Sequence, residues 1–187
     1  ALAEKTFVEN HKNLIHVSIH AGVGAGIILD HHLYTGLAGT AGEAGHMIVQ
    51  PGGRSCPCGN HGCLEQYISE PAVLSTTVSI DDLVWAYNQK ETAALAVTDE
   101  FTTYLACGIN NLWNLFSPEC IILNCQLTAY LPQLLPEILQ KLSPRFRATC
   151  HLKLSTLQDT GVLLGAAKVC ISKYLGTEKL YFSGLQP

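Results

Sequence analysis

Hydrophobic and polar positions alternate over residues 14–20, LIHVSIH, as expected of a half-buried β-strand. A glycine-rich step, AGVGAG, then leads into the apolar segment GIIL, which predicts a second strand. Asp30 and His31 follow as a tight turn into a third strand, HLYTG, and histidine is among the residue types better tolerated at positive φ. The pattern therefore predicts three consecutive strands, preceded by a segment, ALAEKTF, with the composition of a helix.

From Cys63 onward, apolar positions recur at the three- to four-residue spacing of helices. GCLEQYIS and SIDDLVWAYNQK each predict a helix, and Ser79 is placed to cap the second one. A longer helix is predicted before Pro118, and we expect its apolar face to belong to the core. The apolar positions of that face are Val97, Phe101, Leu105, Ile109, Leu112 and Phe116.

Strands and helices alternate over the remainder of the chain. CIILN and HLKLSTL predict strands, whereas LPQLLPEILQKL and GVLLGAAKVCISKYL predict helices, the last ending near Gly176. HMIVQ, residues 46–50, is a candidate for a further strand, and residues 51–62 read as a loop. Strands that alternate with helices after an early meander indicate an α/β sandwich.

The composition indicates a folded chain, since 48% of the 187 residues are hydrophobic and only 14% are charged. This length suits one domain or one lobe of a larger protein, and the uncapped helical start at Ala1 predicts that the natural chain extends upstream. No apolar run reaches the ~20 residues of a membrane-spanning helix. The net charge of −4, without a basic stripe, argues against nucleic-acid binding by this segment alone.

Three of the eight cysteines lie in one loop, as Cys56-Pro-Cys58-Gly-Asn-His-Gly-Cys63. The others are scattered in apolar surroundings, which is typical of reduced cysteines in a cytoplasmic protein and not of a disulfide scaffold. Three thiolates and one imidazole would complete a tetrahedral structural zinc site. Either His46 or His61 could supply the imidazole, and the spacing alone does not choose between them. The alternative is a cluster of reduced cysteines without metal.

Three glycines between the first two predicted strands could approach a phosphate. Gly22, Gly24 and Gly26 would let backbone N–H groups come close to an anion, although a simple hairpin turn also explains them. They do not form a dinucleotide fingerprint, because the segment continues into a strand and not into a helix.

Two carboxylates and a histidine flank the cysteine loop. Glu43 and His46 precede it and Glu65 follows it, so a metal that pins the loop would bring the three side chains together. Carboxylates that accept hydrogen bonds from vicinal hydroxyls are what a sugar pocket requires. The alternative is that Glu43 is solvated and Glu65 is favoured by a helix dipole.

The segments GVGAGII, GEAGHMIV and CPCGNHGCLEQYIS together resemble the ROK family, which groups NagC/XylR-type sugar-responsive transcriptional repressors with sugar kinases. The resemblance runs from ALAE to GAAKV and covers almost the whole chain. It implies the actin-like, ribonuclease H-like ATPase fold, a mixed sheet flanked by helices with a zinc-binding loop. Residues 1–187 would then form the C-terminal lobe.

The resemblance also implies roles for the candidate residues. It implies a structural Zn²⁺ site made of one imidazole and three thiolates: His46, Cys56, Cys58 and Cys63. It implies that three side chains face a sugar or sugar phosphate: Glu43, His46 and Glu65. The glycine turn matches the second phosphate motif of the family.

Two departures from the kinase pattern favour a repressor. Family kinases carry an Asn-Asp segment just upstream of the ALAE-like helix, and its Asp is the catalytic base; this sequence begins after that point. Kinases also place two glycines next to the adenine and ribose, where this chain has Asn124 and Cys125, whose side chains would crowd a nucleotide. We therefore expect no phosphoryl transfer by this polypeptide alone.

The resemblance thus predicts the sugar-sensing part of a cytoplasmic repressor that controls carbohydrate metabolism. DNA would be bound by an N-terminal winged helix-turn-helix domain outside this segment, and a palindromic operator would demand a homodimer or higher homo-oligomer. The alternative is the C-terminal lobe of a hexose or N-acetylhexosamine kinase that uses ATP and Mg²⁺. A protein-interaction role without sugar is a third reading.

Overall fold

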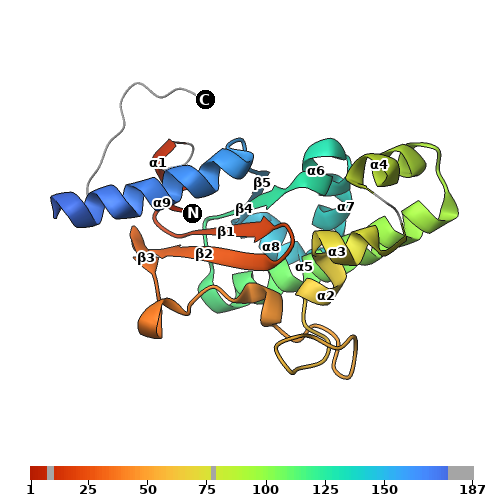
Figure 1. The fold of residues 1–187 in the computed structure, drawn as a ribbon, viewed down its shortest axis with the longest axis horizontal. Helices are drawn as coiled ribbons and strands as arrows, with labels where there is room; N and C mark the ends of the chain where they lie inside the picture. Colours follow the sequence, from red (N-terminus) through yellow and green to blue (C-terminus); the bar gives the residue numbers. More distant parts are fainter. Residues whose placement is uncertain (8–10, 77–78, 177–187) are drawn as a thin grey trace.

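The computed structural model describes residues 1–7, 11–76 and 79–176 and arranges them around one mixed β-sheet (Figure 1). Within this part of the chain the sheet has five strands, in the order β3-β2-β1-β4-β5. The strands are β1 Leu14–Ile19, β2 Val23–Leu29, β3 His32–Tyr34, β4 Cys120–Cys125 and β5 His151–Leu154. The first three pair antiparallel, which confirms the predicted meander, whereas β4 runs parallel to both β1 and β5.

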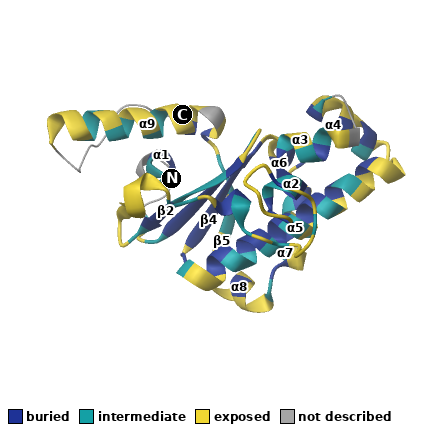
Figure 2. Cartoon of the chain, turned by 60° about the horizontal axis from the view of Figure 1, so that its bottom comes forward, coloured by how far each residue is buried: buried dark blue, intermediate teal, exposed yellow. Residues whose placement is uncertain are grey.

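Helices cover both faces of this sheet, so the predicted α/β class is confirmed (Figure 2). The α-helices are α1 Leu2–Phe7, α2 Glu65–Ile68, α3 Glu70–Val73, α4 Ile80–Asn88, α5 Thr92–Phe116, α6 Gln126–Tyr130, α7 Leu134–Lys141, α8 Pro144–Thr149 and α9 Gln158–Leu175. Short 3₁₀ helices are η1 Leu37–Gly39, η2 Ala44–His46 and η3 Leu74–Thr76. A parallel partner for β1 needs a long crossover, and the segment that contains α2 to α5 supplies it.

The pleat of β1 divides its side chains between two clusters of buried residues. Ile15, Val17 and Ile19 belong to the main core, which includes Phe101 and Leu105 of α5. The residues of the smaller cluster, against which Ala1 and Leu2 pack, are Leu14, Ile28, Cys120 and Ile122. All six residues of β4 are buried, and burial on both faces explains why they are apolar except for Asn124.

The helix ends follow the signals in the sequence. The Ser79 hydroxyl accepts a hydrogen bond from the Asp82 backbone N–H at 3.1 Å, which confirms the predicted cap of α4. The long helix α5 ends at Ser117, in the left-handed conformation with φ 44°, directly before Pro118. Gly176 caps α9 with φ 63°.

The turn between β2 and β3 also forms as predicted. Asp30 and His31 both have positive φ, 48° and 69°, and the antiparallel pair Leu29–His32 closes the turn. Positive φ at both central residues matches the right-handed twist of a two-residue hairpin, which explains why side chains less suited than glycine are held there.

The prediction of a strand over residues 46–50 is wrong. Only Ile48 pairs in the manner of a strand, in an isolated bridge with Cys63. The backbone N–H groups of Val49 and Gln50 both donate to the Gly62 carbonyl, at 2.9 and 3.2 Å. The backbone of this segment is therefore hydrogen-bonded to the cysteine loop and not to the sheet.

The glycine-rich step begins its strand earlier than predicted. β2 starts at Val23, so Gly24 and Gly26 lie inside the strand, opposite Ser18 and His16 of β1. The turn itself is closed by a hydrogen bond from the His20 N–H to the Gly22 carbonyl, 2.9 Å. Of the three glycines, only Gly22 belongs to the turn.

Three short α-helices, α3, α6 and α8, were not predicted. The signal for α8 was present, because Ser143 precedes Pro144 and its hydroxyl accepts from the Phe146 N–H at 3.2 Å.

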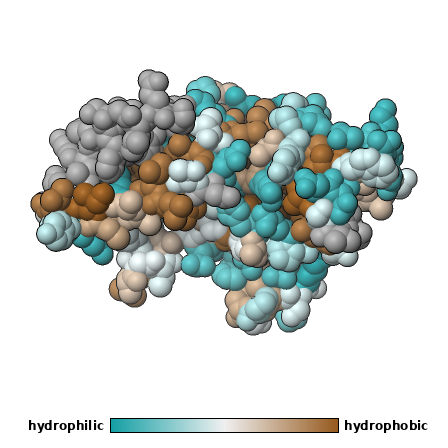
Figure 3. All heavy atoms as spheres, turned by 45° about the horizontal axis from the view of Figure 1, so that its top comes forward, coloured by the Kyte–Doolittle hydropathy of each residue, from teal (hydrophilic) through white to brown (hydrophobic). Residues whose placement is uncertain are grey.

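None of the described helices is long and apolar enough to cross a membrane. Apolar surface gathers on the side of the molecule where α9 lies, and Val162 and Leu163 of this helix are exposed (Figure 3).

Candidate metal centre and adjoining carboxylates

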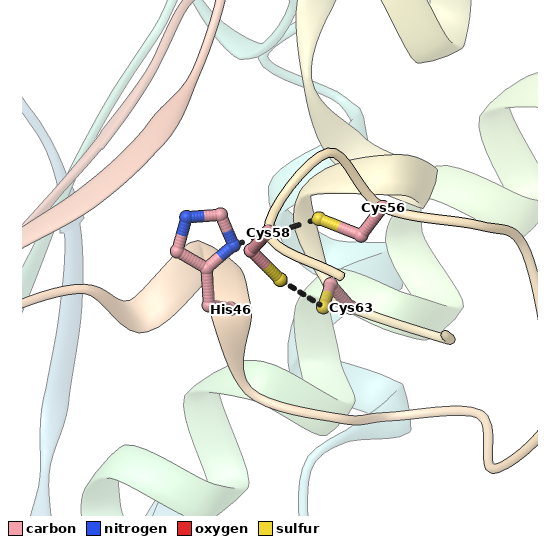
Figure 4. A group of neighbouring side chains, drawn as sticks. All are labelled: His46, Cys56, Cys58 and Cys63. Carbon is pink, nitrogen blue, oxygen red and sulfur yellow. Dashed lines mark hydrogen bonds between the residues drawn. The ribbon is translucent and has the colours of Figure 1, made fainter. Parts of the chain in front are cut away.

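Four side chains from η2 and the cysteine loop converge on one point (Figure 4). The ligand atoms of His46, Cys56, Cys58 and Cys63 all lie within 4.8 Å of one another. His46 Nδ1 is 3.6 Å from the Cys56 sulfur, and the sulfurs of Cys58 and Cys63 are 3.7 Å apart. Sulfurs in a tetrahedral site with ~2.3 Å zinc–sulfur bonds stand about 3.8 Å apart. The cluster could therefore hold a metal ion.

The path of the loop selects the histidine of this cluster. His61 pairs with Ser55 in an isolated bridge and is exposed, and among the described residues it is not part of the group. His46 reaches the cysteines because Val49 and Gln50 bond to Gly62, next to Cys63. The geometry agrees with the residue set that the family resemblance implied.

Gly62 allows this close approach of two backbone segments. It has φ +80°, and a Cβ built on it would lie 1.7 Å from the Gln50 carbonyl oxygen. A side chain at this position would push the loop away from the segment that carries His46.

The loop is also fastened to α5 by contacts that need no metal. The Arg54 guanidinium lies 4.6 Å from the centroid of the Tyr67 ring, and its Nη2 donates to both carboxylate oxygens of Glu100, at 2.9 and 3.0 Å. Tyr67 stacks on Tyr104 with ring centroids 4.0 Å apart, and its hydroxyl accepts from the Arg54 N–H. None of these residues was among the predicted site residues, although a lone arginine directly after Gly52-Gly53 in a loop is a visible signal.

Burial controls the protonation of the innermost thiol. Burial, followed by hydrogen bonds from the neighbouring thiols, raises the pKa of Cys63 to about 12. The pKa of Cys58 is instead lowered, first by the backbone hydrogen bond at Asn60. A metal ion must displace the Cys63 proton on binding, so metal affinity at this cluster will fall with decreasing pH.

The predicted carboxylates lie beside this cluster. Glu43 Oε2 is 4.0 Å from His46 Nε2, so the imidazole directs one nitrogen to the cysteines and the other to this carboxylate. Glu65 opens α2, and its Oε2 accepts a hydrogen bond from the Val23 N–H at 3.0 Å. A Cβ on Gly45 would lie 3.2 Å from Glu65 Cβ, so η2 packs directly against the start of α2. The three candidate sugar ligands thus occupy one neighbourhood.

The glycines of the phosphate motif are not equivalent. Gly22 faces the Glu65 carboxylate, since a Cβ there would be 3.2 Å from Oε2. Gly26 packs against Ala1, where a Cβ would be 2.6 Å from the alanine Cβ. Gly24 has open space, with the Gly42 carbonyl 3.9 Å away. Gly22 therefore leaves room for the Glu65 carboxylate, and Gly26 leaves room for Ala1, which precedes α1.

Asn124 and Cys125, the departures from the kinase pattern, end β4 and are buried. The Asn124 side-chain amide donates to the Gln158 carbonyl at 3.2 Å and lies 3.5 Å from His20 Nε2. The side chain thus connects the carboxyl ends of β1 and β4 with the start of α9.

The relatives of this chain include both repressors and kinases. It is 34% identical to the xylose repressor of Bacillus spizizenii over 192 residues, covering 96% of this chain and 50% of that protein. It is 30% identical to a glucokinase of Halalkalibacterium halodurans, covering 82% of this chain and 55% of that protein. The chain thus spans about half the length of these curated relatives.

Solved structures show the same division. The ROK family transcriptional regulator described as a homolog of the E. coli MLC protein matches with TM-score 0.73 and 32% identity, over 89% of this chain and 48% of that one. The ROK hexokinase of Thermus thermophilus matches with TM-score 0.76 and 25% identity, over 89% and 60%. The family model described as "ROK family" matches residues 1–173. The chain therefore belongs to the ROK family.

Proposed function

We propose that this chain is the sugar-sensing part of a ROK transcriptional repressor that controls carbohydrate metabolism. The observation that carries the proposal is the similarity to a xylose repressor over 96% of the chain. The side chains of Asn124 and Cys125 support it, because they occupy the place where the kinase pattern has two glycines. Residues 1–187 would form the C-terminal lobe, and a separate N-terminal domain would bind DNA.

The carboxylates and the imidazole supply the recognition chemistry. Glu43 and Glu65 would accept hydrogen bonds from sugar hydroxyls, and His46 Nε2, which points away from the cysteines, would bind another. Glu65 is anchored to Val23, at the start of β2, so a sugar that bonds to Glu65 would be coupled through this carboxylate to the β1–β2 hairpin. A sugar that binds one arrangement of the lobes more tightly shifts the population and thereby the DNA affinity.

We propose Zn²⁺ as the metal of the cluster. Three thiolates with one imidazole form a closed donor set that suits structural zinc. Because His46 would serve both metal and sugar, the ion would orient the imidazole toward the pocket. Elemental analysis of the full-length protein should give one zinc per chain, and a chain purified at neutral pH without bound zinc would contradict the assignment.

The function is tested on the full-length protein with a panel of xylose, glucose and N-acetylglucosamine. We expect one sugar to bind by calorimetry and to change operator affinity in a gel-shift assay, with no ADP formed from Mg-ATP. Glu65→Gln should weaken sugar binding at least tenfold, since about 1.5–3 kcal/mol is typical of a hydrogen bond to a charged group. Glu91→Gln is the matched control, at an exposed glutamate that directly precedes α5 and whose side chain does not cap the helix.

The alternative is a sugar kinase, favoured by the similarity to the glucokinase and to the ROK hexokinase structure. Sugar-dependent ADP formation by the full-length protein, together with no effect of sugar on DNA binding, would replace the repressor by the kinase. The repressor also predicts a cytoplasmic homodimer, because a palindromic operator binds a twofold partner.

A further inference from the structure

The carboxyl ends of β1 and β4 lie next to α3 and α6 (Figure 1). Residues at these strand ends and on both helices line a cavity. Its volume of about 390 Å³ falls within the ~300–1,000 Å³ typical of small-molecule sites. The residues that line it are His20, Glu70, Asn124, Cys125, Gln126, Ala129, Tyr130 and Gln158. None of the residues proposed above for sugar sensing belongs to this lining.

The lining is rich in hydrogen-bonding side chains and carries no cation of fixed charge. A carboxylate, an imidazole and amide groups converge there, whereas neither lysine nor arginine is among the lining residues that the structure describes. The Glu70 carboxylate lines the cavity, with its Oε1 3.6 Å from His20 Nδ1, and supplies a negative charge to the cavity wall. A phosphate group would meet this carboxylate without a guanidinium or an ammonium to balance it.

The polar walls are held in place by backbone and side-chain hydrogen bonds. The Glu70 N–H donates to the His20 carbonyl at 2.9 Å, which ties α3 to the end of β1. The Asn124 side chain ties the end of β4 to the start of α9 through its hydrogen bond to the Gln158 carbonyl. These residues are far apart in the sequence, and the hydrogen bonds between them fix their relative positions. A preformed site requires such fixed positions.

Tyr130 adds an apolar surface at the edge of the cavity. Its side chain is 52% exposed on α6, beside Ala129. An exposed aromatic ring next to carboxylate and amide groups suits a ligand that has both hydroxyls and an apolar C–H face.

We propose that this cavity binds an uncharged, hydroxyl-rich ligand of monosaccharide size and rejects phosphorylated ligands. Glu70, His20 and Gln126 would hydrogen-bond the hydroxyls, and Tyr130 would cover the C–H face of the ring. The site differs from the one formed by Glu43, His46 and Glu65, so it adds a second ligand to the proposed sensor without depending on it. The β1–β2 turn borders both sites, since His20 lines the cavity and Gly22 faces the Glu65 carboxylate.

Calorimetric titration of the full-length protein with xylose, glucose, N-acetylglucosamine, adenosine and ATP tests the proposal. We expect two sites per chain for at least one monosaccharide and no heat from ATP. Glu70→Gln and Tyr130→Ala should each weaken one of the two sites at least tenfold and leave the other unchanged. Tyr130→Ala should fold normally, because this half-exposed side chain contributes little to the core. Its effect on binding can therefore be measured even if Glu70→Gln fails to fold.

The variants separate this site from the sensing site. Glu65→Gln should weaken the other of the two sites. If Glu65→Gln leaves all sugar binding unchanged while Glu70→Gln and Tyr130→Ala still weaken one site, the proposed function is rejected and the cavity proposal stands. The cavity proposal is overturned by a single monosaccharide site that Glu70→Gln and Tyr130→Ala leave unchanged. Binding of ATP, or of adenosine without any monosaccharide, at a site sensitive to these two variants would also overturn it.

Discussion

Replacing Gly45 by alanine should weaken sugar binding while leaving the chain folded. Gly45 is buried in η2, between Glu43 and His46, and packs on both Val23 and Glu65. An added Cβ would lie 2.5 Å from the Val23 carbonyl oxygen, about 0.9 Å inside the 3.4 Å of ordinary contact. A backbone oxygen in a paired strand cannot rotate away, so η2 must move outward.

The overlap sets the size of the effect. Overpacking of this kind costs about 1–3 kcal/mol of stability. A displacement on the order of 1 Å separates Glu43 and His46 from Glu65, which removes at least one good hydrogen bond from a ligand that needs all three. Loss of a charge-assisted hydrogen bond, about 1.5–3 kcal/mol, corresponds to a roughly 10- to 100-fold higher Kd.

Gly24→Ala is the matched control, because Gly24 follows Val23 in β2 and a Cβ on it would meet nothing closer than the Gly42 oxygen at 3.9 Å. Its stability should equal or exceed that of the parent by up to ~1 kcal/mol, since alanine is favoured over glycine inside a strand. Urea denaturation measures stability and calorimetry measures the Kd of the full-length variants. A Gly45→Ala protein that is folded and binds sugar within twofold of the parent would refute the packing argument.

Two further predictions concern the cluster and a buried histidine. Cys56→Ser should release the metal and weaken sugar binding, whereas Cys170→Ser, an exposed cysteine of α9, should change neither; equal sugar affinity in zinc-free protein would disprove the coupling. Burial lowers the pKa of His16 to about 3 despite the Glu4 carboxyl 3.8 Å away, so the unfolded chain, with a histidine pKa of about 6.5, binds more protons. Stability is therefore complete above pH 6.5 and falls toward pH 3, by about 2 kcal/mol between pH 7 and pH 5. Urea denaturation at both pH values should show this loss in the parent and not in His16→Leu, and an equal loss in both would assign it to other groups.

Local patterns in the sequence were sufficient for most of the elements. The meander over residues 14–34, the helix before Pro118 and the caps at Ser79 and Gly176 each depend on neighbouring residues alone, through periodicity, backbone conformation or a side chain that bonds to its own helix. The expectation for residues 46–50 failed because their backbone partner, Gly62, lies at the far end of the loop that follows, and no local pattern indicates that the loop folds back. Short elements such as α6 have too little periodicity to be recognised.

The composition of the sites was decided by the tertiary structure. Spacing alone did not choose between His46 and His61, whereas the family resemblance favoured His46. The path of the loop against residues 49–50 places His46 beside Cys56. The cavity shows the same dependence more strongly, since His20 and Asn124 meet only because β1 and β4 pair in parallel after a long crossover. Periodicity reports which face of an element is buried, but which distant residues face each other depends on strand register and packing, and these are set by the whole chain.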